Sequence, residues 1–356
     1  MMAEKTFVSC FIWMKKRIFI ALLAVSIVFV LVHYIASNSI LQVVNRRSQL
    51  ENTSKILIES IHAQTDATKL MKITSKNAFL LYLKRMKSMH GNYYEVKTLN
   101  TGPVSYDTSD RWPERIDGNP KWEPDTYNEF NYWLPKSQYY VGFGTWIGVT
   151  LFYGTQLVKK AVGFEGDPTA YASVYANLEG NSHRNWYNHT FVYPVAVRKG
   201  NDNGEPKRVS MRSSSAGNSC SGMKEIRMKN QACGNDINSV SWDIDAYTLP
   251  HLLMVNGIPP SKETFVKIDV ESYECELIPS WFDWLKSSPS KPTLFISFHG
   301  QSVRCCSEYQ YAKILEVSKL YKGVWHNLKK LNLTDLFINA PCPPPKTTRV
   351  LVFSDL

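Results

Sequence analysis

From residue 137 onward, short apolar runs alternate with longer stretches of helical periodicity. Apolar runs of about four to eight residues are typical of buried strands, and their alternation with helices predicts βαβ units around a parallel sheet. We expect strands at 139–143, 161–164, 191–197, 265–270, 293–298 and 350–353, and helices at 148–158, 167–178, 247–255, 273–286 and 308–321. The predicted fold is therefore α/β: a Rossmann-like, doubly wound, mostly parallel sheet in residues 137–356, which binds its ligand across the carboxyl ends of the strands.

An apolar run near the N-terminus predicts a membrane anchor. Residues 18–36 read IFIALLAVSIVFVLVHYIA, and such a helix spans roughly 28 Å at about 1.5 Å per residue, close to the hydrocarbon thickness of a bilayer. A cleaved signal peptide would have a shorter apolar core of about 7–15 residues and a small-residue cleavage site, whereas His33 and Tyr34 are bulky. Basic residues at 15–17 keep the tail, residues 1–17, cytoplasmic. We predict a single-pass, type II signal-anchor.

Two further features favour a location of residues 37–356 in the lumen of the Golgi or the ER. Six of the seven cysteines follow the apolar run, an even number compatible with disulfides. Cys305 and Cys306 cannot easily bond to each other across one peptide, so their pairing is left open. No CxxC pair occurs, and no metal site is predicted. Acceptor sequons for N-glycosylation begin at Asn52, Asn188 and Asn332.

Residues 37–136 are predicted to form a stem and an N-terminal extension. The stem is polar, and an apolar patch at 79–83 has helical spacing. Residues 101–136 are rich in Pro, Trp, Asp and Tyr, with little periodicity, and we expect an ordered loop that packs against the following domain.

The first strand-to-helix turn is the strongest candidate site. It contains Gly142, Gly144, Thr145 and Gly148, and its glycines allow a tight turn while the following helix offers free N–H groups to a ligand. Glu165 follows Gly144 by about 20 residues, at the end of the next strand, where an acid is expected to bind a ribose diol. The alternative is that Glu165 and its neighbour Asp167 only cap the next helix; we assign the ribose to Glu165 and the cap to Asp167.

Later strands end in further candidates. Asp269 and Glu271 follow the run at 265–270, where a buried carboxylate needs a partner such as a sulfonium or a substrate hydroxyl. The alternative is a helix-capping acid cluster, and Glu274 and Glu276 are expected on a helix surface. His299 ends the next strand and could accept a proton from a hydroxyl, or it could be a hydrogen-bonded loop residue.

Four segments resemble the successive signatures of FkbM-type methyltransferases: YVGFGTWIGVT, VGFEGDPTAYASVYANL, IDAYTLPHLL and FVKIDVESYECEL. They occur in the family's order, and the resemblance covers roughly residues 137–300. It implies a class I methyltransferase-like fold, S-adenosylmethionine (SAM) as methyl donor, and O-methylation of a hydroxyl, often on a sugar. By position, it implies that Gly144, Gly148 and Glu165 bind SAM and that Asp269 lines the reacting centre. The expected partner is a glycan or another hydroxyl-bearing acceptor.

The chain departs from this family at three positions. Gly142 stands where the first strand commonly ends in Asp, Trp146 at an Asn-like position, and Ser272 where Gly usually follows the acids. The missing Asp removes a carboxylate expected near the amino-acid part of SAM, and one charge-assisted hydrogen bond contributes about 1.5–3 kcal/mol. A non-catalytic descendant that keeps the fold as a binding module is therefore one alternative.

Other classes of protein fit the sequence less well. A dinucleotide enzyme would show G-x-G-x-x-G, whereas here the glycines follow G-x-G-x-x-x-G. A type II glycosyltransferase could hold a divalent ion with the D-x-D formed by Asp243 and Asp245, and Asp243 is also included among the candidate cofactor contacts. The net charge of +10 is partly in the N-terminal tail and otherwise scattered, so no nucleic-acid partner is predicted.

Overall fold

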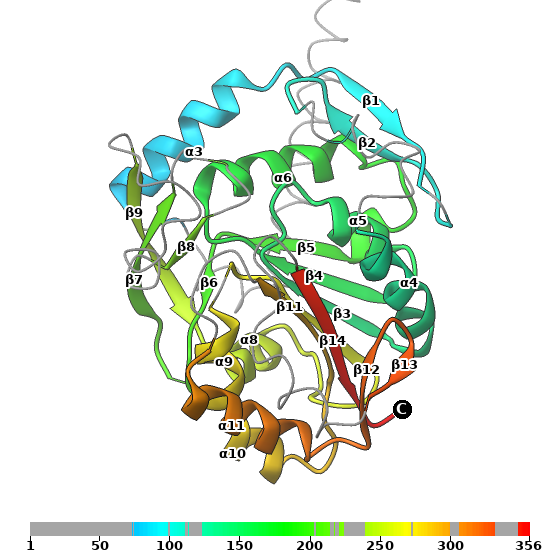
Figure 1. Cartoon of the computed structure of the whole chain (residues 1–356). Coiled ribbons are helices and arrows are strands. Elements are labelled where there is room, and N and C mark those ends of the chain that lie inside the picture. Colours follow the sequence, from blue (N-terminus) through cyan, green and yellow to red (C-terminus); the bar gives the residue numbers. More distant parts are fainter. Residues whose placement is uncertain are drawn as a thin grey trace, which may run out of the picture. The chain divides into compact units, whose positions relative to one another are not determined.

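The computed structural model describes residues 75–98, 100–110, 123–202, 204–213, 221–223, 239–271, 273–299, 306–331 and 348–356, together with residues 73, 113 and 217. Residues Asp66–Leu356 form one compact unit (Figure 1). The predicted tail and anchor, residues 1–36, lie outside the described residues. Within the described ranges, no helix has the length and apolar character needed to span a bilayer.

A central sheet contains eight strands in the described part of the chain. Five of them, from β5 to β11, are parallel, whereas β14 runs antiparallel between β11 and β12. The strand order reverses at β3, because β4 lies on one side of it and β10 on the other. The carboxyl ends of these strands are therefore the topological switch point of the sheet. The spatial order is β13 (Lys329–Lys330), β12 (Gly323–His326), β14 (Thr348–Ser354), β11 (Thr293–His299), β10 (Thr264–Ile268), β3 (Tyr139–Phe143), β4 (Lys160–Phe164) and β5 (Thr190–Tyr193). The predicted α/β fold with a mostly parallel central sheet is confirmed.

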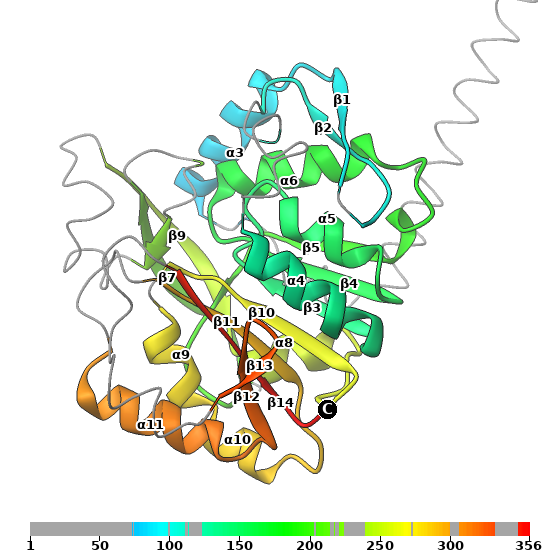
Figure 2. The ribbon, with the colours of Figure 1, turned by 45° about the vertical axis from the view of Figure 1, so that its right-hand side comes forward.

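Helices cover both faces of this sheet, as expected for a doubly wound fold (Figure 2). On one face, Phe130, Phe152 and Val174 join a core with alternate strand residues. They come from α4 (Pro124–Trp133), α5 (Val149–Thr155) and α6 (Pro168–Gly180). On the other face, a second core is formed with residues from α8 (Leu249–Val255), α9 (Glu274–Ser280), α10 (Phe282–Ser287) and α11 (Glu308–Ser318). The strands are thus buried on both sides, which explains their continuous apolar runs.

Local sequence sets several helix ends. Asp167 caps α6 by accepting from the N–H groups of Thr169 and Ala170, with Pro168 at the first helical position, as predicted. The single helix expected at 273–286 is instead two, α9 and α10, which meet at Trp281. Pro279 lies at the end of α9 and has no N–H for a helical hydrogen bond, so the first helix stops there.

A smaller sheet involves the polar, Gly- and Ser-rich residues 200–238, in which no strand was predicted, and the segments on either side of them. It has the order β6 (Ala196–Val197), β9 (Val240–Tyr247), β7 (Lys207–Ser213) and β8 (Gly222–Met223). Residues 200–238 lack apolar periodicity and predict irregular structure, which is wrong for β7 and β8. In β7 only Val209 and Met211 are apolar, so the alternation is weak and the strand depends on pairing with the distant β9.

The N-terminal extension packs on α6. The patch at 79–83 lies in α3 (Lys76–Ser88), which confirms its helical spacing, and a hairpin follows, β1 (Tyr93–Val96) and β2 (Val104–Asp107). Asn181 of α6 bonds both the N–H and the C=O of Ser105 in β2. The prediction of a loop at 101–136 was wrong for residues 104–107, which form β2, and for residues 124–133, which form α4. The Pro- and Asp-rich start of α4 makes the helical spacing of Phe130 and Trp133 difficult to recognise.

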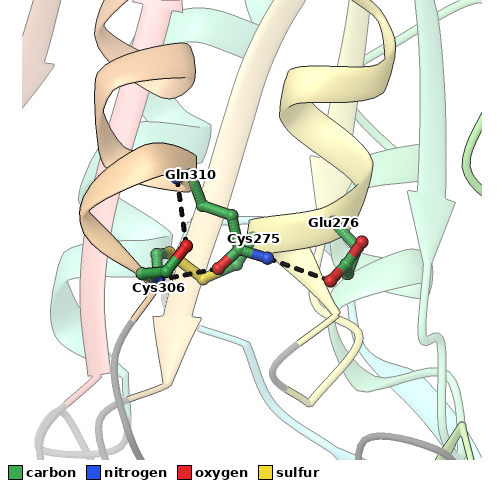
Figure 3. The surroundings of a disulfide bond; sticks show 5 residues. Cys275, Glu276, Cys306 and Gln310 are labelled. Carbon is green, nitrogen blue, oxygen red and sulfur yellow. Dashed lines mark hydrogen bonds between the residues drawn. A yellow bond between two sulfur atoms is a disulfide. The ribbon is translucent and has the colours of Figure 1, made fainter.

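One disulfide joins Cys275, in the first turn of α9, to Cys306, just before α11 (Figure 3). Beside it, the Gln310 amide donates to the Glu276 carboxylate at 2.9 Å. The bond therefore ties the helix that follows the Asp269 motif to the helix that follows β11. Cys305 lies outside the described residues.

Candidate cofactor and active site

The glycine turn between β3 and α5 requires two of its glycines. Gly144 has a φ of +74°, and a Cβ there would lie 1.8 Å from the carbonyl oxygen of Asp269, so the ends of β3 and β10 touch through this residue. Gly148 has a φ of +97°, and a Cβ would lie 2.3 Å from the Phe152 ring. No L side chain fits either position without a shift of the backbone or of its neighbours. The first two sequence motifs are thus brought together.

Glu165 is bonded to this turn. Its Oε2 accepts from the Trp146 N–H at 2.7 Å, and its Oε1 accepts from the Asp167 N–H at 2.8 Å. Burial raises the pKa of Glu165 to about 8, and the charges of Asp167 and Asp269 contribute to the rise. A carboxylate offers about four acceptor positions, so two backbone bonds leave capacity for further donors.

Asp167 also binds a second segment of the chain, which lies against the glycine turn. Besides capping α6, its Oδ2 accepts from the Gly217 N–H at 2.9 Å and from the Ser221 hydroxyl at 2.6 Å. Burial raises the pKa of Asp167, and these bonds oppose that rise. The Trp146 indole donates to the Gly217 carbonyl at 3.1 Å. The cap predicted for Asp167 is confirmed, and the same side chain also fixes the segment that lies against Trp146.

Trp146 adopts a backbone conformation that its side chain does not favour. Its φ is +49°, in the left-handed region, where Gly and Asn are common and bulky residues are not. The peptide is held there because its N–H bonds to Glu165 and its indole bonds to Gly217. Strained residues of this kind persist where the surroundings over-determine them, often at functional sites.

Asp269 lies at the carboxyl end of β10 and forms an ion pair with Lys267. The Lys267 side chain is 3% exposed and that of Asp269 is 20% exposed. Burial, the largest single influence, lowers the pKa of Lys267, but the charge and hydrogen bond of Asp269, with smaller contributions from Tyr140 and Glu123, together raise it above its ordinary value. The pair thus places a carboxylate, held by a buried ammonium, next to the glycine turn.

The loop after Asp269 is held by a residue that the sequence interpretation assigned elsewhere. Glu274 is buried, not on the helix surface, and its Oε1 accepts from the Val270 N–H at 3.1 Å. Its spacing of four residues from Val270 could have suggested this role. Glu271, in the loop after Asp269, has a φ of +52° and is a second strained position of the site besides Trp146, and Ser272 lies outside the described residues.

The position of Gly142 has room for a small side chain. Gly142 pairs with Lys267 across the sheet, and its φ is not positive. A Cβ would lie 3.3 Å from the Tyr140 hydroxyl oxygen and 3.6 Å from Thr145 Cγ2, which is tight but tolerable if the tyrosine moves slightly. The buried Thr145 hydroxyl has no hydrogen-bond partner within the described structure. The turn therefore keeps a buried polar group, the Thr145 hydroxyl, that is available to a ligand.

The predicted cofactor contact Asp243 and its neighbour in the D-x-D motif, Asp245, lie outside this cluster. Asp243 lies on β9, where Trp242 is buried and donates to the Gly166 carbonyl at 2.8 Å, so the next side chain points to the opposite face. Asp243 accepts from Ser210, and Asp245 pairs with Arg208, both across to β7. Among the described residues, no three acids, histidines or cysteines gather as a metal site. His299 ends β11 as predicted, and the role of its imidazole stays a prediction.

Comparisons with known proteins give only distant likenesses. A scan against protein-family models finds no match, and a search of curated proteins finds none either. Among solved structures, methyltransferase FkbM from Methylobacillus flagellatus KT matches at 15% identity and a TM-score of 0.31, over 61% of this chain and 44% of that one. The O-methyltransferase from Bacillus cereus in complex with SAH matches at 10% identity and a TM-score of 0.29, over 64% and 78%. The bifunctional kinase-methyltransferase WbdD matches at 9% identity and a TM-score of 0.32, over 67% and 43%.

The chain thus spans less than half of the first of these structures. At such identities and TM-scores, the assignment of a fold depends on the chain's own strand order and not on the likeness. The cluster at the switch point consists of Gly144, Thr145, Gly148, Glu165 and Asp269, with Lys267 and Glu274 as supports that sequence reasoning did not assign to the site.

Proposed function

We propose that the chain is a SAM-dependent methyltransferase that O-methylates a hydroxyl of a glycan or glycoconjugate in the secretory lumen. The observation that carries this proposal is the convergence of three motifs at one edge of the sheet. Gly144 contacts Asp269, and the turn that follows is bonded to Glu165. Ligands of doubly wound sheets bind at this edge.

The residues of the cluster fit SAM in part. Glu165 keeps acceptor capacity for a ribose diol, and the buried Thr145 hydroxyl can bond a further polar group of the ligand. Gly142 offers no carboxylate to the amino-acid end. When bound, SAM supplies an electrophilic methyl group.

Asp269 is the residue we assign to the acceptor hydroxyl. Its carboxylate is partly exposed, is held in place by Lys267, and can accept the proton that leaves the hydroxyl. His299 and Glu271 are the other candidates for this role. Much of the rate enhancement would come from alignment of the hydroxyl with the methyl group, because positioning alone can lower a barrier by about 7–11 kcal/mol.

Three features support the location in the lumen of the Golgi or the ER. The apolar run at 18–36 favours a type II anchor. The Cys275–Cys306 disulfide is typical of an oxidising compartment. Asn188, the acceptor of one sequon, is exposed and is accessible to glycosylation.

Calorimetry and thermal shift of the full chain with millimolar SAM test the proposal. We expect saturable heat and a rise in the unfolding temperature, both weakened in Glu165→Ala, which removes the diol acceptor. Matched titrations with NAD test for a dinucleotide enzyme, and matched titrations with a nucleotide sugar plus manganese test for a glycosyltransferase. No response to SAM together with a response to either rival would overturn the assignment.

One observation favours a second candidate, a non-catalytic methyltransferase-like binding module. The turn has Gly142 beside the Lys267–Asp269 pair, and Trp146 is bonded to Gly217 above Glu165. The variant Gly142→Asp distinguishes the two. The binding module becomes the better description if the natural chain shows no SAM binding and the variant binds SAM with an affinity at least tenfold above the detection limit.

A further inference from the structure

Among the residues that the structure describes, the contacts that fix helix α3 to the domain lie on one side of it. Ala78 is fully buried, and the Arg85 side chain donates to the Ser173 hydroxyl at 2.8 Å and pairs with Asp110. These residues lie on one face of the helix, since 78 and 85 are seven positions apart, or about two turns. The side that faces the domain is therefore determined.

The opposite side of α3 combines exposed apolar and cationic side chains. Phe79 is 46% exposed and Leu80 is 53% exposed. The exposed Lys76, Lys84 and Lys87 accompany them, and the helix sequence, KNAFLLYLKRMKS, contains no acid. Such a mixture is typical of a helix that lies in a membrane interface, with apolar groups at the acyl boundary and lysines at the phosphates.

The apolar side chains on this face are held in place. The Phe79 ring stacks on Tyr82 with centroids 6.5 Å apart, and Tyr82 contacts Tyr171 of α6 at 5.8 Å. Because the aromatic contacts continue into the domain, Phe79 is presented in an ordered position. Little conformational freedom would be lost when it enters a bilayer.

We propose that this face of α3, formed by Lys76, Phe79, Leu80, Lys84 and Lys87, binds the surface of a phospholipid bilayer. The lysines favour an anionic partner, and the exposed Phe79 and Leu80 between them favour the boundary between phosphates and acyl chains of a bilayer. This inference rests on the membrane anchor of the proposed function, residues 18–36. Residues 37–72 connect that anchor to α3 and can span at most about 3.6 Å per residue. A tether of this kind raises the effective concentration, so a weak interface suffices.

The test uses the full chain in lipid nanodiscs of phosphatidylcholine with phosphatidylinositol. An environment-sensitive fluorescent amino acid replaces Leu80, and in a matched control it replaces Met254, which is 54% exposed on α8. Brominated lipids are expected to quench the label at 80 by about twofold and to leave the label at 254 nearly unchanged. The variant K76E/K84E/K87E is expected to lose most of that quenching, because the reversed charges repel phosphate.

Equal quenching at the two positions would overturn the proposal, as would quenching unaffected by charge reversal. Energy transfer between copies in place of lipid quenching would assign the face to a second copy and also refute it. Carbonate extraction of the same chain reports separately on the anchor, and SAM calorimetry reports separately on the enzyme. A failure of either is thereby distinguished from a failure of the α3 interface.

Discussion

Replacement of Glu165 by Gln should remove a specific pH dependence from the stability of the domain. The ordinary pKa of this carboxyl is 4.5, and burial raises it to about 8 in the folded state. Between these values the folded protein holds a proton that the unfolded chain has released. Stability therefore decreases as pH rises through this window, by at most about 1.4 kcal/mol per pH unit.

The comparison is made by urea unfolding of the compact unit Asp66–Leu356 at pH 5.5 and pH 7.5. Wild type should lose about 2 kcal/mol more than Glu165→Gln between the two conditions, because other titrating groups cancel in the difference. The variant also loses one acceptor for the N–H groups of Trp146 and Asp167, which lowers its stability at both pH values. Only the difference in slope reports on the pKa.

Parallel slopes in the two proteins would refute the reasoning, since they would mean that Glu165 is ionised in the folded state at pH 7. The same group predicts the pH dependence of ligand binding. A ribose diol prefers the ionised carboxylate, so SAM affinity should increase as pH rises toward 8 and then level off.

Three further predictions concern the turn, the disulfide and the sequon. At position 146, Trp→Gly should be more stable than Trp→Ala by about 1 kcal/mol in thermal unfolding, since both lose the indole but only Gly accepts a positive φ; the reverse order would contradict the strain. Joint replacement of Cys275 and Cys306 by Ala should cost about 3–4 kcal/mol in denaturant unfolding, because the bond closes a loop with a sequence separation of 31; unchanged stability would argue that the bond does not form. In secretory expression, Asn188→Gln should lose one glycosidase-sensitive shift on a gel, and an unaltered pattern would exclude glycosylation at this exposed residue.

The central sheet was predictable because its strands are buried on both faces and read as short apolar runs, such as those that begin at Tyr139 and Phe265. The small sheet was not, because β7 is polar and forms only by pairing with β9, which is distant in sequence. The candidate site was likewise predictable only in part. Gly144 and Glu165 have recognisable spacing, whereas a buried lysine within an apolar strand gives no sequence signal that it pairs with Asp269 two residues later.

The interior position of Asn177 has a consequence for how the chain can be divided. Its side chain donates to the Ile147 carbonyl in the glycine turn and to Asp110, and it accepts from the Asp107 N–H of the hairpin. Phe130 and Trp133 of α4 are also fully enclosed by the core. A fragment beginning at residue 137 would thus expose an aromatic surface and remove the partners that Asn177 has at Asp107 and Asp110. The residues upstream of the alternating pattern are therefore part of the core of this domain, and a minimal folding unit must include the hairpin and α4.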